Sequence, residues 1–298
     1  MDKRLLAIFA ATGASAIYGL NHTIAKGVMP THIEAFGFIM LRVLGAAILF
    51  WILSPFAPKE KVEKKDWPRM LCCAIFGMCI NMLFFFKGLS LSTPINSSVI
   101  ITVSPVMVLI LASIILKEKI TLLKGVGIAF GLSGALALVV FSTDSVTNAP
   151  NIPLGNLMFI VNAFSYGLYL VIVKPLTKKY HAITLMKWLF LMGVFLNLPV
   201  TYSEFVAVDW FHLPFDAIWR MAFVVAGTTF STYLLNIYAL KQLSASTISV
   251  FIYLQPLIAI IYAILVGADQ LTTIKVAAGL LVFVGVYLVS FKKTKTRA

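Results

Sequence analysis

Amide and hydroxyl side chains recur at helical spacing within long apolar stretches of this sequence. Ser98, Thr102 and Pro105 follow a four-then-three spacing, which places them on one face of a helix. Such polar groups must face water, a solute or another helix, because hydrocarbon offers them no hydrogen-bond partner. The pattern is compatible with a binding site for a small solute and with hydrogen bonding between helices. The candidate cavity residues are Asn21, His22, Asn81, Ser98, Thr102, Thr232, Asn236, Ser249, Tyr253 and Gln255.

Three basic residues within or beside apolar stretches could select solutes by their charge. Arg42 lies deepest, and Glu34 lies eight residues earlier, about two helical turns away, which disfavours direct pairing between them. Arg42 could hold neighbouring backbone carbonyl groups or attract an anionic group of a substrate. Lys26 and Lys87 make the predicted outer mouth weakly cationic, which suits solutes that carry a carboxylate or a phosphate.

The acidic residues, histidines and cysteines do not form a pattern that indicates catalysis. Every Asp and Glu lies in a tail, a loop or near the end of an apolar stretch. His22 could carry a proton near neutral pH, although a single histidine beside Asn21 is also typical of a hydrogen-bonded structural group. Cys72, Cys73 and Cys79 share one apolar stretch, which predicts a packing role. We therefore expect no enzyme activity, no catalytic residue, no metal and no cofactor.

The elements that carry these residues are predicted to be membrane-spanning helices. Of the 298 residues, 60% are hydrophobic and 12% are charged, whereas soluble domains contain roughly 25% charged residues. A helix of about 20 apolar residues crosses a bilayer, and a β-barrel would instead show short alternating segments. We predict an all-α membrane protein with ten transmembrane helices. They are placed near residues 5–25, 33–53, 69–88, 94–116, 122–141, 153–173, 183–202, 217–238, 246–266 and 271–291.

The net charge of +13 is explained by membrane topology. With the N-terminus inside, 18 of the 24 basic residues fall on the inner side of these spans, four fall outside, and Arg42 and Lys187 remain within spans. This is the positive-inside pattern, so no nucleic-acid partner is expected. We predict a multi-pass protein of the inner (cytoplasmic) membrane with both termini in the cytoplasm.

The two halves of the chain repeat each other. Shifts of 148 or 151 residues align Tyr18 with Tyr166, Lys26 with Lys174, Gly45 with Gly193, Leu89 with Leu240, Ser98 with Ser249, and Pro105 with Pro256. We place one five-helix repeat at residues 1–145 and the other at residues 150–298. Because five is odd, the second repeat must enter the membrane in the opposite direction, as in many secondary transporters.

Two prolines are predicted to break helices at equivalent positions of the repeats. Pro105 and Pro256 fall near the centres of the fourth and ninth predicted spans, and each removes one backbone hydrogen bond. The carbonyl groups of Ile101 and Ile252, four residues earlier, must then find other donors. A kink around a cavity and a kink used only for packing both remain open, and the symmetric placement favours the cavity.

The duplicated motifs resemble those of a known family. The pair Ser104-Pro105 is followed by LKEKIT at residues 116–121, and the second half carries QPL at 255–257 and DQLT at 269–272. Over essentially the whole chain, the sequence resembles the EamA-like transporters of the drug/metabolite transporter superfamily. The resemblance implies alternating access and a central cavity surrounded by the first, third, fourth, sixth, eighth and ninth helices. It also implies export of amino acids or other metabolites.

We therefore expect a secondary transporter that exports amino acids or similar small metabolites. One alternative is a proton-coupled multidrug or metabolite exporter, although the first helix lacks the buried carboxylate of the small four-helix multidrug relatives. A lipid-active membrane protein is a second alternative. The expected partners are a small-molecule substrate and the lipid bilayer, and we expect a monomer or a weak dimer. The substrate, the direction of transport and any coupling ion stay open at this point.

Overall fold

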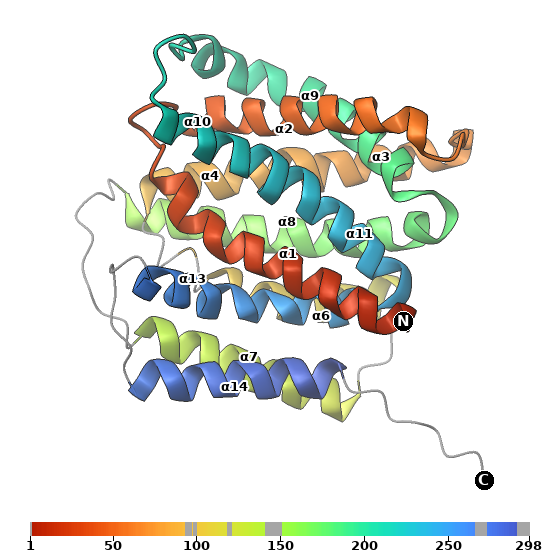
Figure 1. Cartoon of the computed structure of the whole chain (residues 1–298). Helices are drawn as coiled ribbons and strands as arrows, with labels where there is room; N and C mark the ends of the chain where they lie inside the picture. The colour runs from red at the N-terminus through yellow and green to blue at the C-terminus, as the bar shows by residue number, and fades with distance from the viewer. Residues whose placement is uncertain are drawn as a thin grey trace.

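The computed structural model describes residues 2–92, 97, 100–117, 121–140, 151–265 and 273–290. Within these ranges the regular structure is helical and includes no strand, which confirms the predicted all-α class. The helices form an elongated bundle in which most of them run roughly alongside one another (Figure 1). Their bounds are α1 (Lys3–Lys26), α2 (Ala35–Leu53), α3 (Trp67–Cys73), α4 (Asn81–Leu91), α6 (Ser104–Ile115), α7 (Leu122–Val140), α8 (Ile152–Lys179), α9 (Ala182–Val206), α10 (Phe215–Ala222), α11 (Thr232–Gln242), α12 (Ala245–Val250), α13 (Leu254–Leu265) and α14 (Thr273–Ser290).

Within the described ranges, six continuous helical stretches are long and apolar enough to cross a membrane. They are Lys3–Lys26, Ala35–Phe56, Lys64–Leu91, Pro153–Lys179, Ala182–Val206 and Phe215–Gln242. Shorter apolar helices cover Ser104–Ile115, Leu122–Gly134 and Ala245–Ala259, which fall within three of the remaining predicted spans. The prediction of several apolar helices is therefore confirmed, and the count of ten stays a prediction.

Two of the long stretches contain a π-helical segment in the middle. Residues Ala74–Ile80 form the π-helix η3 between α3 and α4, and residues Phe223–Ser231 form the π-helix η4 between α10 and α11. A π-turn accommodates an extra residue and rotates the face that the following turns present. A uniform period of 3.6 residues, as assumed from the sequence, is therefore not exact across these segments.

Both repeat-related prolines lie in the first turn of a helix. Pro105 follows Ser104 at the start of α6, after non-helical turn residues at positions 102 and 103. Pro256 lies in the first turn of α13, directly after the 3-10 segment η5 (Phe251–Tyr253). A proline costs little in a first turn, because the backbone N–H that it lacks would have no partner within the helix. The helical path is thus interrupted just before each proline.

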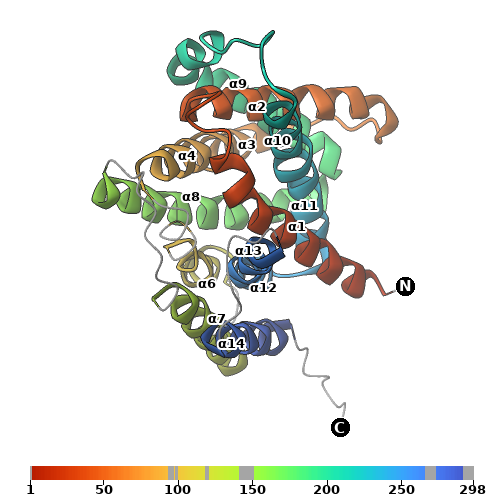
Figure 2. The same cartoon turned by 60° about the vertical axis from the view of Figure 1, so that its left-hand side comes forward.

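The first helix of each half packs mainly against helices of the other half. Helix α1 packs against α11 and α13, while α8 packs against α4 and α6. Helices α2 and α9 form one long contact, and α7 and α14 form another at the edge of the bundle (Figures 1 and 2). These contacts bring α1, α4, α8 and α11 together around the centre of the bundle.

Ion pairs and hydrogen bonds tie α8 to the segment that follows α2. The Asp66 carboxylate accepts from the Lys179 ammonium and from the Tyr180 hydroxyl, each at 2.5 Å. Lys179 also contacts Glu63 at 2.7 Å. Hydrogen bonding by the Lys179 ammonium lowers the pKa of the exposed Glu63 carboxyl group. The C-terminal end of α8 is therefore fixed to the first half of the chain.

A carboxylate from α9 caps the start of α2. The Glu204 Oε2 atom accepts from the backbone N–H groups of Phe36 and Gly37 at 2.6 and 3.0 Å. Both donors lie in the first turn of α2, where N–H groups lack helical partners and a negative charge is stabilising. This cap could not be predicted from sequence patterns, because its two sides are 167 or 168 residues apart.

Replacing Glu204 by alanine is expected to lower the free energy of unfolding by about 1 kcal/mol, since both N–H groups lose their acceptor. Glu204→Gln should lower the free energy of unfolding by a smaller amount, because the amide oxygen can still accept a hydrogen bond. Thermal unfolding of the purified protein in detergent measures both effects. The adjacent exposed residue provides the control Ser203→Ala, and equal unfolding temperatures for Glu204→Ala and this control would argue against the cap.

Candidate functional site

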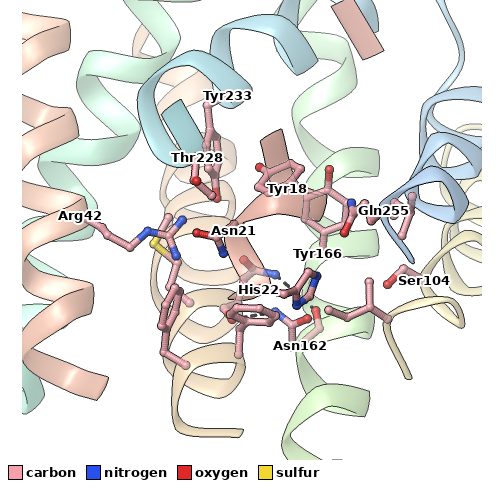
Figure 3. A pocket seen from close by; sticks show the side chains of 16 residues that line it. Tyr18, Asn21, His22, Arg42, Ser104, Asn162, Tyr166, Thr228, Tyr233 and Gln255 are labelled. Carbon is pink, nitrogen blue, oxygen red and sulfur yellow. Dashed lines mark hydrogen bonds between the residues drawn. The ribbon is translucent and has the colours of Figure 1, made fainter. Parts of the chain in front are cut away.

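A cavity of about 80 Å³ lies among α1, α2, α4, α8, α11 and the starts of α6 and α13. Figure 3 shows its side chains converging from these elements. The wall combines amide, hydroxyl and aromatic groups with one arginine. The lining residues are Tyr18, Asn21, His22, Arg42, Asn81, Met82, Phe85, Phe86, Ile101, Ser104, Asn162, Tyr166, Thr228, Tyr233, Ile252 and Gln255.

Two asparagines from different halves of the chain form reciprocal hydrogen bonds at the cavity wall. The Asn162 amide donates to the backbone carbonyl of Asn81 at 2.8 Å, and the Asn81 amide donates to the carbonyl of Asn162 at 3.4 Å. Two reciprocal amide bonds link α4 to α8 where the helices line the cavity. They hold both side chains in place while leaving their amide oxygens available as acceptors.

His22 occupies a neighbouring part of the wall. Its Nδ1 atom lies 3.2 Å from the Ser97 hydroxyl oxygen, and its ring stands edge-on to Phe85 with centroids 5.7 Å apart. Gln255 from α13 also lies within hydrogen-bonding reach of the imidazole. The ring is 4% exposed, so it can meet only water or solute that enters the cavity. His22 is thus held by hydrogen bonds and also faces the cavity.

Arg42 extends from α2 into the cavity and has no acidic partner among the described residues. Its Nε donates to the Thr229 hydroxyl oxygen at 2.8 Å, and its guanidinium carbon lies 4.5 Å from the centre of the Phe86 ring. The side chain is only 5% exposed. Of the two roles considered from the sequence, holding backbone carbonyls does not match these contacts, because no carbonyl of a described residue accepts from the guanidinium.

Two buried polar atoms at the cavity wall have no hydrogen-bond partner among the residues that the structure describes. They are the Oδ1 atom of Asn21 and the hydroxyl oxygen of Thr228. A buried polar atom without a partner costs about 1–3 kcal/mol, and most such atoms in proteins are paired with a protein group or with water. Both atoms can therefore accept a group brought by a ligand or by water.

The structure brings together only part of the predicted site. Asn21, His22, Asn81, Gln255 and Arg42 line the cavity. Five other candidates are buried beside it without lining it. These are Thr102, Thr232, Asn236, Ser249 and Tyr253. Ser98 lies outside the described residues.

Thr232 and Asn236 do not line the cavity themselves, although both side chains lie within hydrogen-bonding reach of the lining residue Tyr18. Helical spacing grouped Thr228, Thr232 and Asn236, but η4 rotates the later turns, so Thr228 and Tyr233, five residues apart, face the cavity. Thr232 instead donates its hydroxyl group to the carbonyl of Thr228. The break before α13 has a similar effect on Ser249, whose hydroxyl group donates to the carbonyl of Ser246 at 3.1 Å.

The two predicted lysines lie away from the cavity wall. The Lys26 ammonium donates to the backbone carbonyl of Leu89 at 2.9 Å, in the last turn of α4. The Lys87 ammonium lies 5.3 Å from the centre of the Phe36 ring. Neither residue lines the cavity, so any effect that they have on a solute in the cavity is indirect.

Sequence reasoning missed the aromatic wall and Asn162. The wall includes Tyr18, Tyr166 and Tyr233, together with Phe85 and Phe86. The repeat contained a usable signal, since Tyr18 aligns with Tyr166 and both face the cavity. Aromatic residues inside apolar helices ordinarily indicate packing, so only their repetition at equivalent positions distinguished them.

Long apolar helices that surround a small polar cavity define a multi-pass membrane protein of the transporter class. The profile of the EamA-like transporter family matches residues 5–140 and again residues 153–291. The chain belongs to the EamA-like transporter family, within the drug/metabolite transporter superfamily.

Similar proteins come from distant organisms. An "Uncharacterized transporter" from Archaeoglobus fulgidus is 29% identical over 89% of this chain and 90% of its own length. "Uncharacterized transporter YyaM" from Bacillus subtilis is 24% identical over 97% of this chain and 94% of its own length. A crystal structure of another protein shares the fold with a TM-score of 0.77 at 14% identity, over 95% of each chain.

Proposed function

We propose that this protein is a secondary transporter that exports amino acids or similar small metabolites by alternating access. The single observation that supports this most strongly is the central polar cavity, whose wall is assembled from helices of both halves. A solute in this cavity would contact both halves at once, as expected when two repeats move about a shared site. A catalytic role has less support, because no group of three or more His, Cys, Asp or Glu side chains in the described part of the chain could hold a metal.

Paired features support the proposal of two inverted five-helix repeats. The packing of α1 on α11 and α13 has its counterpart in the packing of α8 on α4 and α6. The π-helices η3 and η4 occupy equivalent places in the two halves, and the family profile matches the chain twice. On this basis we propose ten spans with both termini in the cytoplasm and rocking of the halves about the cavity.

Two lysines form equivalent contacts at opposite ends of the bundle. Lys26 of α1 donates to the carbonyl of Leu89 near the end of α4, and Lys174 of α8 donates to the carbonyls of Leu240 and Leu243 at the end of α11. Figure 1 shows the ends of α1 and α4 on one side and those of α8 and α11 on the other. We call these contacts the Lys26 clamp and the Lys174 clamp. The Lys26 clamp joins two helices of the first half, and the Lys174 clamp joins two helices of the second half. Because each clamp lies at one end of the bundle, release of one clamp would open one end.

Flux measured in proteoliposomes tests the proposed function. Purified protein should give saturable flux of labelled amino acids or small organic acids above empty liposomes. Gln255→Ala should reduce this flux about two- to tenfold by removing an amide from the wall, since a lost hydrogen bond costs about 0.5–1.5 kcal/mol. Gln242→Ala, at an exposed position on α11, is the matched control. An absence of flux for every solute would contradict the proposal.

The same experiment distinguishes the proton-coupled alternative. His22 is the titratable side chain of the wall whose ordinary pKa lies nearest neutrality. Flux that requires a pH gradient and loses this requirement in His22→Gln would favour proton coupling. Flux that persists without a gradient would favour a facilitative carrier.

A further inference from the structure

The charge of the cavity wall is set by Arg42. Its guanidinium group has five N–H donors, of which only Nε–H forms a hydrogen bond with the described residues, and that acceptor is the neutral Thr229 hydroxyl group. The Phe86 ring stabilises the cation without neutralising it. A buried cation without an anionic partner is costly, because burial removes most of its hydration.

No acidic side chain of the described residues compensates this charge. The cavity lining contains neither Asp nor Glu. The described acids lie at or near helix ends, where Glu204 caps α2 and Asp66 pairs with Lys179. Within the described part of the chain no side chain supplies the compensating negative charge, which leaves that role to the solute.

The groups beside the guanidinium indicate which functional groups an anionic solute would place next to it. The buried Thr228 hydroxyl group has no partner in the described part of the chain and can donate to a second anionic oxygen. The unpartnered Asn21 Oδ1 can accept from a hydroxyl or N–H group of the solute. Figure 3 shows the Arg42 side chain extending toward Asn21, with Thr228 above them. Guanidinium groups bind carboxylates through two parallel N–H donors, so this corner has the donors that a carboxylate uses.

The rest of the cavity suits a compact apolar body. Tyr18, Phe85, Tyr166 and Tyr233 contribute ring surfaces to the wall. The volume of about 80 Å³ accommodates roughly five to eight water molecules, which occupy roughly 150–240 Å³ as liquid. That space is sufficient for an organic acid with a single ring.

We propose that Arg42 makes this transporter selective for small organic monocarboxylates of net negative charge, with an apolar or aromatic body and a hydrogen-bond donor beside the carboxylate. The proposal rests on the proposed transport function and narrows its substrate class. A zwitterionic amino acid is disfavoured relative to the corresponding hydroxy acid, because its ammonium group finds no carboxylate in the cavity. Arg42 pairs with the carboxylate, Thr228 donates to it, and Asn21 accepts from the neighbouring hydroxyl group.

A series of four compounds of nearly equal shape tests the charge requirement. Labelled 3-phenyllactate is anionic, phenylalanine is zwitterionic, phenyllactamide is neutral and phenylalaninamide is cationic. Wild-type proteoliposomes should transport 3-phenyllactate fastest, and an inside-positive membrane potential should accelerate its entry. Arg42→Gln should lower the ratio of 3-phenyllactate flux to phenyllactamide flux about tenfold or more, since hydrogen bonds to charged groups are the stronger ones. The flux ratio of Arg42→Lys should lie between those of the wild type and Arg42→Gln, because an ammonium keeps the charge but lacks the planar pair of N–H donors.

Controls separate charge recognition from folding and from the transport function itself. Arg69→Gln removes an exposed arginine and should leave the ratio unchanged. If neither Arg42 variant folds, the thermal unfolding temperature of the wild-type protein tests the charge requirement instead. We expect 3-phenyllactate to raise this temperature more than phenyllactamide does. Equal stabilisation, preferred transport of phenylalanine or phenylalaninamide, or an unchanged ratio in Arg42→Gln would overturn the proposal while leaving transport intact. No flux of these or any other solutes would instead contradict the transport function.

Discussion

Replacing Lys174 by methionine is expected to open the end of the cavity where α11 terminates. The Lys174 ammonium bridges α8 to the carbonyl group of Leu240, in the last turn of α11, and to that of Leu243, which directly follows this helix. Hydrogen bonds from a charged donor contribute about 1.5–3 kcal/mol, and a cation at a helix C-terminus is further favoured by the dipole. Loss of this clamp should therefore shift the population toward the state open at that end about tenfold or more.

Labelling of a cysteine in the cavity measures this shift. The three native cysteines are replaced by alanine and Ser104, which lines the cavity, is changed to cysteine. In Lys174→Met, a membrane-impermeant thiol reagent should label this cysteine faster from the side of the α11 terminus. Lys26→Met should accelerate labelling from the opposite side, because its clamp lies at the other end.

The control for this pair is Lys178→Met, which removes an exposed lysine one turn further along α8 and should leave labelling unchanged. Equal acceleration from both sides in Lys174→Met would indicate general loosening of the bundle. An equal effect of Lys178→Met would indicate surface charge. Either result would contradict the role assigned to the Lys174 clamp.

Replacing Gly155 by valine is expected to destabilise the crossing of α4 and α8. A Cβ atom on Gly155 would lie 2.6 Å from the Cβ atom of Ser92 and 2.9 Å from the carbonyl oxygen of Gly88. One of these atoms belongs to the backbone, so relief requires the helices to separate. Overpacking of this kind typically costs about 1–3 kcal/mol, and backbone contact places Gly155 toward the upper end of that range.

The matched control is Gly125→Val on α7, where an added Cβ atom meets no other atom within 4 Å. Valine is a somewhat better helix former than glycine, so this variant should unfold at or slightly above the wild-type temperature. Thermal unfolding in detergent, followed by tryptophan fluorescence, compares the two. Equal unfolding temperatures for Gly155→Val and Gly125→Val would show that α4 and α8 do not cross so closely.

The cavity shows where sequence patterns succeed and where they fail. Asn21, His22 and Arg42, which lie in continuous α-helices, line the cavity, and so do Asn81 and Gln255, which follow the irregular segments η3 and η5. Thr232 and Asn236, which follow the π-segment η4, do not line it, and no pattern in the sequence announced the extra residue in η4. Which face a helix presents after such a segment depends on how neighbouring helices pack.

Long-range partners were equally invisible in the sequence. The sequence suggested that Lys26 would attract solutes at a mouth, whereas the structure pairs its ammonium with the carbonyl of Leu89. It could not pair Glu204 with the start of α2, nor Asn162 with Asn81. Each of these contacts joins residues more than sixty positions apart, and periodicity carries information only over a few turns.

The sequence by itself determined that this chain forms apolar helices and that it resembles the EamA-like transporters. Segment length and hydrophobicity decide whether a helix is stable in lipid, and the repeated landmark residues survive at fixed offsets. The tertiary structure alone decided which polar side chains share the cavity and that Arg42 stands there without an acidic partner among the described residues. The physical reason is that charge compensation and helix rotation depend on side chains contributed by distant helices, so they are fixed only when those helices pack together.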